Sequence, residues 1–98
     1  MSMSASTRDF LDRALSVLPT SEDDLLLSGI TFRVTARMTE LKGVILSMKS
    51  KHGSLESLEK EIEKTGVSPD DHTLYTDMLE WKAADFELSK LVDLLGSV

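Results

Sequence analysis

The sequence contains no cysteine, and only two prolines and five glycines occur among its 98 residues. Without cysteine the chain has no disulfide framework, no catalytic thiolate and no cysteine-ligated zinc site. Because proline and glycine interrupt regular structure, their scarcity favours long helices over many short strands. The hydrophobic content of 41% suits a modest core. The chain is therefore predicted to form one small helical domain over residues 1–98, with frayed ends at 1–6 and 96–98.

Long apolar runs are also missing. No segment approaches the roughly 20 apolar residues that a membrane-spanning helix needs. The first residues, Met1 to Ser6, lack the basic and apolar regions of a signal peptide. We expect a cytoplasmic protein without a membrane span, and secretion by a route that needs no signal peptide stays open.

Aromatic residues make up only 5% of the chain, and the single Trp and Tyr both lie between residues 68 and 95. This stretch has a strong helix start, with Ser68 as a cap, Pro69 in the first helical position and two aspartates at the positive end of the helix dipole. Apolar residues then recur every three or four positions, which predicts a helix over 69–95 with one buried face. That face comprises Leu74, Met78, Trp81, Ala84, Leu88, Leu91 and Leu95.

A second, shorter apolar stripe lies on the same predicted helix. It consists of Tyr75, Leu79 and Phe86, and Lys82, Asp85 and Ser89 separate it from the first stripe. One interpretation is that the helix is wedged between two others, so that both stripes are core. The other is that the second stripe meets a partner, because a domain of this size has little material to cover a helix on two sides.

Residues 22–52 are predicted to form the longest helix. Ser21 resembles a capping-box start with Asp24, and Gly53 suits a left-handed helix end. The run Ile30–Thr35 alternates apolar and polar residues and is rich in β-branched side chains, which is typical of a strand. We favour a continuous helix because the three–four spacing persists on both sides of this run. The spaced apolar residues are Leu27, Ile30, Val34, Met38, Leu41, Ile45 and Met48.

Two shorter helices complete the prediction. The first runs from Thr7, as its cap, to Leu18, with an apolar face of Phe10, Leu11, Ala14, Leu15 and Leu18. The second runs from Ser54 to Lys64 and ends at Gly66. The predicted fold is all-α: a hairpin of two long antiparallel helices, a short bridging helix, and an N-terminal helix packed across them.

Catalytic and cofactor motifs are not found. Neither histidine, His52 nor His72, lies in a helical metal-binding spacing, and no nucleophile elbow or glycine-rich phosphate loop occurs. We therefore expect no enzyme activity, no catalytic residue, no metal, no cofactor and no small-molecule substrate.

Residues 33–51 form a basic segment in a chain of net charge −6. The basic residues are Arg33, Arg37, Lys42, Lys49 and Lys51, against Glu40 alone. A basic helix could bind nucleic acid or an anionic surface, but this one lacks aromatic residues for base stacking and the overall acidity repels polyanions. Pairing with acidic neighbours of the same chain is the favoured interpretation, and nucleic acid is disfavoured as a partner.

The segment Ser68-Pro69-Asp70-Asp71, followed by Leu74, Tyr75, Met78, Leu79 and Glu80, resembles the C-terminal part of small type III secretion components. These are needle subunits, inner-rod subunits and needle co-chaperones, which are small helical hairpins. The resemblance covers about the last 35 residues, and the chain departs from it by lacking a segment rich in Tyr, Asn, Arg and Gln and by having an extra N-terminal helix. It implies a secretion-apparatus subunit or chaperone.

These observations favour a non-enzymatic protein that packs its amphipathic helices against a protein partner or against itself. Aromatic residues on an exposed face are frequent anchors of such interfaces. The predicted partner-binding residues are Tyr75, Leu79 and Phe86, with Arg33 and Arg37 on the basic helix as a further surface.

Overall fold

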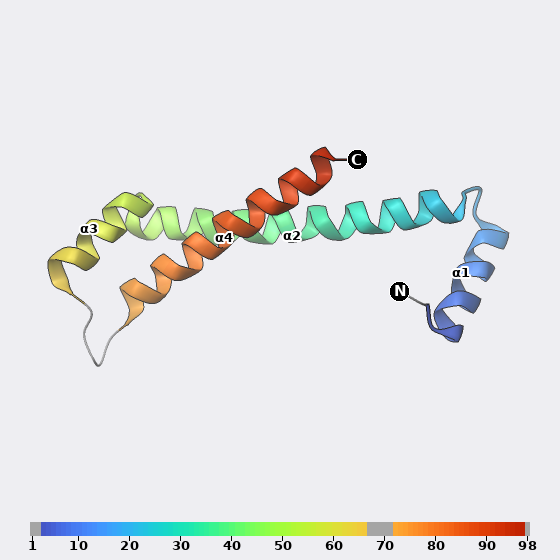
Figure 1. Cartoon of the computed structure of the whole chain (residues 1–98), viewed down its shortest axis with the longest axis horizontal. Coiled ribbons are helices and arrows are strands. Elements are labelled where there is room, and N and C mark those ends of the chain that lie inside the picture. Colours follow the sequence, from blue (N-terminus) through green and yellow to red (C-terminus); the bar gives the residue numbers. More distant parts are fainter. Residues whose placement is uncertain (1–2, 67–71, 98) are drawn as a thin grey trace. The chain divides into compact units, whose positions relative to one another are not determined.

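The computed structural model describes residues 3–66 and 72–97, which form four helices and no strand (Figure 1). Helix α1 spans Ala5–Val17, α2 spans Glu22–His52, α3 spans Leu55–Thr65 and α4 spans Thr73–Gly96. The prediction of an all-α protein with two long and two short helices is confirmed. Residues Ile30 to Thr35 lie within α2, so the strand alternative is wrong: the helical spacing of the stripe prevails over the local β-propensity.

Most helix ends follow the predicted chemistry. The backbone N–H of Asp24 donates to the Ser21 side chain at 3.1 Å, and the Ser54 side chain accepts from Ser57 N–H at 3.0 Å. Gly53 and Gly66 have φ values of 81° and 72°, in the region where a side chain would be strained. Gly53 and Ser54 thus form the turn between α2 and α3.

The predicted caps of the first and last helices are Thr7 and Ser68. Helix α1 begins at Ala5, and its cap is Ser4, whose side chain accepts from Thr7 N–H. The prediction of Thr7 as the cap is wrong, because Ser4 caps the helix one turn earlier and Thr7 then lies in its first turn. The predicted cap Ser68, with Pro69 and the two aspartates, lies outside the described residues; α4 begins at Thr73, after His72.

The chain divides into two compact units, residues 1–33 and 34–98. In the first unit, Leu11 is buried, whereas Phe10 and Leu18 of the same predicted apolar face are exposed. The Arg8 guanidinium pairs with the carboxylate of Glu22 at 2.8 Å and joins α1 to the start of α2. Packing of α1 across the hairpin stays a prediction.

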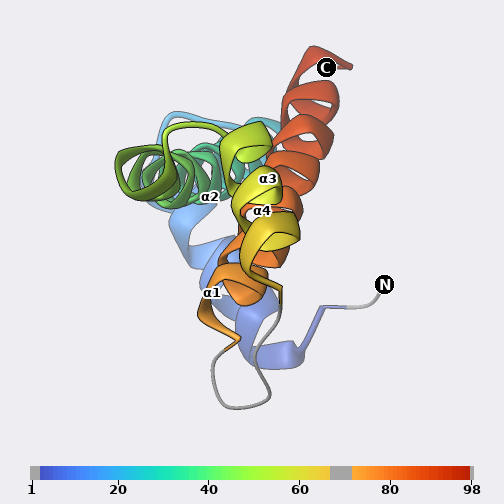
Figure 2. The same cartoon turned by 90° about the vertical axis from the view of Figure 1, so that its left-hand side faces the viewer.

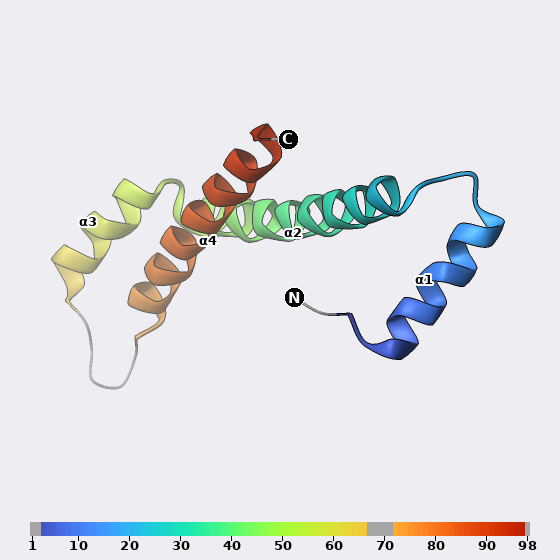
Figure 3. The same ribbon diagram turned by 45° about the vertical axis from the view of Figure 1, so that its right-hand side comes forward.

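In the second unit, the remainder of α2 lies against α3 and α4. Figure 1 shows α4 crossing α2, and Figures 2 and 3 show α3 running beside the first turns of α4. Two pairs of side chains define the direction: Asp77 of α4 contacts His52, and Glu87, further along α4, contacts Arg37, further back along α2. The two helices are therefore antiparallel, as predicted.

The core of this unit forms where the three helices meet. Its buried residues are Leu41, Ile45, Met48, Leu58, Trp81 and Ala84, with Leu58 at 0% and Trp81 at 3% exposure. Every residue of the first α4 stripe is buried or half-buried, which confirms that face as core. On α2 the stripe is covered only in part, because Leu27 and Ile30 are exposed. Trp81 lies in a cluster with Leu41 and Ile45 of α2.

Candidate interaction surface on helix α4

The outer face of α4 carries the second predicted stripe. Tyr75, Leu79 and Phe86 are 42%, 48% and 67% exposed. At about 100° per residue, their mean direction lies roughly 160° from that of the core stripe, which puts them on the opposite side of the helix. In the structure of this chain the stripe is therefore not core.

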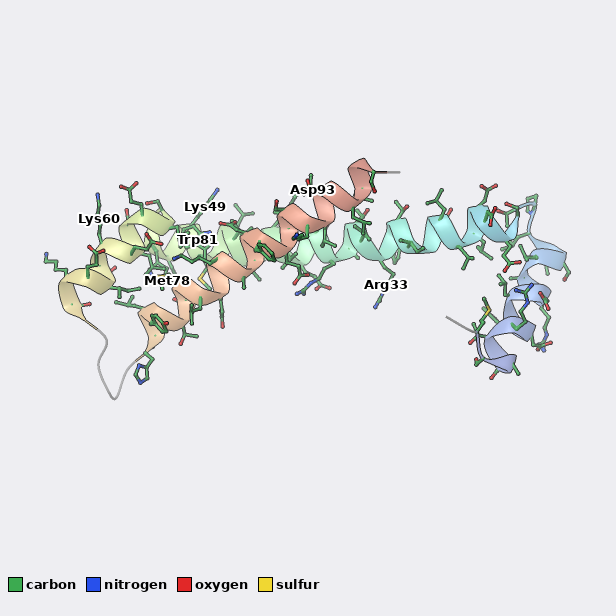
Figure 4. The ribbon with its side chains drawn as sticks, in the orientation of Figure 1. Arg33, Lys49, Lys60, Met78, Trp81 and Asp93 are labelled. Carbon is green, nitrogen blue, oxygen red and sulfur yellow. The ribbon has the colours of Figure 1, made fainter. Side chains whose placement is uncertain are left out.

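We call the exposed surface formed by Tyr75, Leu79 and Phe86 the α4 outer face. Charged residues lie at its edges. Lys90 Nζ lies 5.2 Å from the centre of the Phe86 ring, a cation–π geometry. Lys82 Nζ lies 2.9 Å from Glu59 Oε1 of α3, so one edge of the face is tied to α3. Figure 4 shows Asp93 projecting from the last turns of α4, and that residue is exposed. The face thus combines an apolar centre with charges at its edges, as protein interfaces do.

The predicted basic residues have different surroundings. Arg37 Nη2 donates to Glu87 Oε1 at 3.0 Å, and its Nε donates to the other carboxylate oxygen, so the pair is bidentate. Arg37 Nη1 also lies 3.0 Å from Glu40 Oε2. These contacts raise the pKa of Arg37 and lower that of Glu87. Arg33 is exposed (Figure 4) and has no ion pair with any described residue. A partner-binding role for Arg33 and Arg37 stays a prediction.

A groove of about 240 Å³ opens between α2 and α4 beside this ion pair. Ligand pockets are typically about 300–1,000 Å³, so this groove suits one side chain better than a substrate. Its lining residues are Arg37, Leu41, Val44, Glu80, Ala83, Ala84 and Glu87. No group of three or more metal-ligating side chains occurs among residues 3–66 and 72–97, and within the same ranges no helix is long and apolar enough to cross a bilayer.

A buried polar contact links the end of α2 to α4 and was missed by the sequence reasoning. His52 Nε2 and Asp77 Oδ2 are 2.8 Å apart, and both side chains are about nine-tenths buried. The hydrogen bond from His52, helped by Lys51 at 3.6 Å, holds the pKa of Asp77 below its usual value. The spacing of the two residues could have predicted this contact. His52 follows Met48 by four positions and Asp77 precedes Trp81 by four, so both occupy core-face positions.

No family model matches this chain, and neither the curated proteins nor the solved structures include a significant match. Its functional assignment consequently depends on the geometry described above.

Proposed function

We propose that this chain is a non-enzymatic helical interaction module whose α4 outer face binds a protein surface. The observation that carries the proposal is the exposure of Tyr75, Leu79 and Phe86 together on one face of a helix whose opposite face is already packed. Because a few residues, among which tyrosine is enriched, supply most of the binding energy of an interface, a stripe that contains Tyr75 and Phe86 suits the centre of one.

The chemistry around the face also supports binding rather than catalysis. The strongest polar contacts join two helices: the ion pair of Arg37 with Glu87 and the hydrogen bond of His52 with Asp77. Each of these contacts has a structural role, because it holds two helices together. The groove between α2 and α4 is small and has no buried polar side chain lacking a hydrogen bond among the described residues.

Single serine substitutions at Tyr75, Leu79 and Phe86 test the proposal. Because these side chains are exposed, each variant should keep the melting temperature close to that of the wild type. Each should weaken self-association or capture of a partner in a pull-down. Leu46→Ser is the matched control, since Leu46 is 65% exposed on α2 and outside the proposed face.

A loss of stability in these serine variants would contradict the proposal. If each substitution lowered the stability of a monomeric protein by more than about 2 kcal/mol, the stripe would be core. The proposed face would then be wrong, and the surface around Arg33, Arg37 and Glu40 would be the next to test.

A narrower form of the proposal is a small type III secretion subunit or needle co-chaperone. The antiparallel α2–α4 pair and the exposed residues Tyr75 and Leu79 support it, because the resemblance includes these residues. Genes for a secretion apparatus beside this gene would favour that form; their absence would favour the general one.

Binding of an anionic surface through residues 33–51 receives less support. Arg37 is paired with Glu87 and Lys51 with Asp77, so two of the five basic side chains already have acidic partners. Retention of the protein on a heparin column at physiological salt would reverse this order of preference.

A further inference from the structure

We infer that the groove between α2 and α4 binds one long basic side chain, a lysine or an arginine, of a partner protein, and that Glu80 receives its charge. The groove has a volume of about 240 Å³, and Val44, Glu80 and Ala83 are among the residues that line it. None of its lining residues belongs to the α4 outer face. The inference therefore adds a second contact site to the proposed function and does not depend on the first.

The groove offers an apolar surface to an aliphatic stem. Leu41 and Ala84 are each 4% exposed, and Val44 and Ala83 are exposed beside them. The methylene stem of a lysine or an arginine can lie along such a surface while its charged end stays near water. Because small-ligand pockets usually exceed about 300 Å³, the smaller volume of this groove suits a single side chain.

The charges of the groove leave one carboxylate without a cation. Arg37 and Glu87 also line the groove, and their bidentate contact satisfies both charges. Glu80 is exposed and makes no ion pair with any residue in the ranges 3–66 and 72–97. No cation lies three or four positions away from it on α4 either. Those positions are Thr76, Asp77, Ala83 and Ala84.

The sequence of α2 explains why Glu80 lacks a partner. Along α4, Glu80 lies between Asp77 and Glu87, and a cation of α2 contacts each of these two carboxylates. The cations are Lys51 for Asp77 and Arg37 for Glu87. Between these two cations α2 lines the groove with apolar residues. A cation supplied by a partner would complete the row of ion pairs that α2 leaves incomplete.

A basic side chain suits this groove better than an apolar or an acidic one. An apolar side chain would remove water from Glu80 without giving it a partner, which costs free energy. An acidic side chain would be repelled by Glu80 and by the net charge of −6 of the chain. The same net charge attracts a basic partner, and arginine is enriched among the residues that contribute most to binding.

Small molecules that mimic the two basic side chains test the site directly. n-Butylammonium and n-butylguanidinium combine an aliphatic stem with a cation, whereas methylammonium lacks the long stem and n-butanol lacks the charge. In NMR titrations the two butyl cations should shift the amide signals of Val44, Glu80 and Ala83 in a saturable way. Methylammonium and n-butanol should bind at least about fivefold more weakly, because each lacks one half of the interaction. Saturable binding of either butyl cation supports the inference, and the stronger of the two identifies the preferred side chain.

Substitutions in the groove separate its charge from its shape. Glu80→Gln keeps the size of the side chain and removes its charge, so n-butylammonium should bind at least about fivefold more weakly while binding of n-butanol is unchanged. Glu63→Gln is the matched control, since Glu63 is exposed on α3 and lies outside the groove. Ala83→Leu should block both compounds by filling the groove. Because Ala83 is exposed, this variant should keep the melting temperature of the wild type.

Two results would overturn the inference: no saturable shift with either butyl cation, or equal binding of n-butylammonium to Glu80→Gln and Glu63→Gln. Tyr75→Ser separates this site from the proposed function. Because Tyr75 lies outside the groove, the variant should bind n-butylammonium as the wild type does, even where it loses a partner in a pull-down. A Tyr75→Ser variant that keeps both its partner and its cation binding would overturn the α4 outer face and leave the groove intact.

Discussion

His52 and Asp77 share a buried hydrogen bond of 2.8 Å between the last residue of α2 and the second turn of α4. An ionised carboxylate only accepts, so Nε2 of His52 is the donor. The contact fixes where the two long helices meet, because each residue occupies a core-face position that an apolar residue would otherwise fill. Polar groups at such positions are costly unless both are satisfied.

Replacing Asp77 by Ala should destabilise the protein by about 1–3 kcal/mol, because His52 would be left buried without its acceptor. Urea denaturation followed by far-UV circular dichroism measures the change. Asp85→Ala is the matched control, since Asp85 is exposed on the same helix and should change stability by no more than about 0.5 kcal/mol. Equal effects of the two substitutions would show that the buried contact contributes nothing specific.

The same pair predicts a dependence of stability on pH. The pKa of Asp77 is lowered in the folded protein, chiefly by the hydrogen bond from His52. The contribution of ionised Asp77 to the stability of the fold is therefore complete above the unfolded-state pKa of about 3.9. It is lost as the pH falls through the lower, folded-state pKa.

Because Glu22 and Glu87 also have lowered pKa values, the comparison has to be made between the wild type and Asp77→Asn. The difference between their unfolding free energies should shrink below about pH 4. A constant difference between pH 7 and pH 2 would contradict the prediction.

Trp81→Ala should cost about 3–5 kcal/mol, because the side chain is 3% exposed and packs in the cluster with Leu58 and Ile45. Such a loss is comparable to the whole stability of many small domains. Thermal melting measures it, with Leu46→Ala as an exposed control. A variant that melted within a degree or two of the wild type would show that Trp81 is not core.

Arg37 and Glu87 should be coupled in a double-mutant cycle with alanine at each position. Their bidentate contact joins α2 to α4 across 50 positions of sequence. Since both side chains are about half exposed, at 49% and 42%, salt should screen the interaction. The coupling is expected to be measurable at low ionic strength and to fade in 1 M salt, where the Debye length is about 3 Å. Coupling that is unchanged by salt would argue for a desolvated pair instead.

Local features of the sequence predict most of the fold. Ser21 and Ser54 cap their helices as expected, and Gly53 and Gly66 end theirs with positive φ. These signals depend on neighbours within a few residues, so no knowledge of the tertiary structure is needed. The start of α1 was misplaced because Ser4 and Thr7 are both good caps, three positions apart.

The tertiary contacts of the polar residues were harder to predict. Arg37 was expected to face acidic neighbours. Which acidic residue it pairs with, here Glu87, depends on how α4 crosses α2. His52 was considered as a possible metal ligand, although its spacing from Met48 placed it on the core face. For Tyr75, Leu79 and Phe86, periodicity showed a second stripe, and only the packing of α3 and α4 showed that it is exposed.

The single tryptophan has a consequence for how unfolding is observed. Trp81 lies in the unit formed by residues 34–98, and residues 1–33 contain no tryptophan. Its fluorescence therefore reports the environment of that unit, whereas amide signals from α1 and from the first turns of α2 originate elsewhere. If residues 1–33 unfold independently, the amide signal will change in a denaturant titration while the tryptophan fluorescence stays constant. The difference between the two unfolding transitions will then measure the stability of the N-terminal unit.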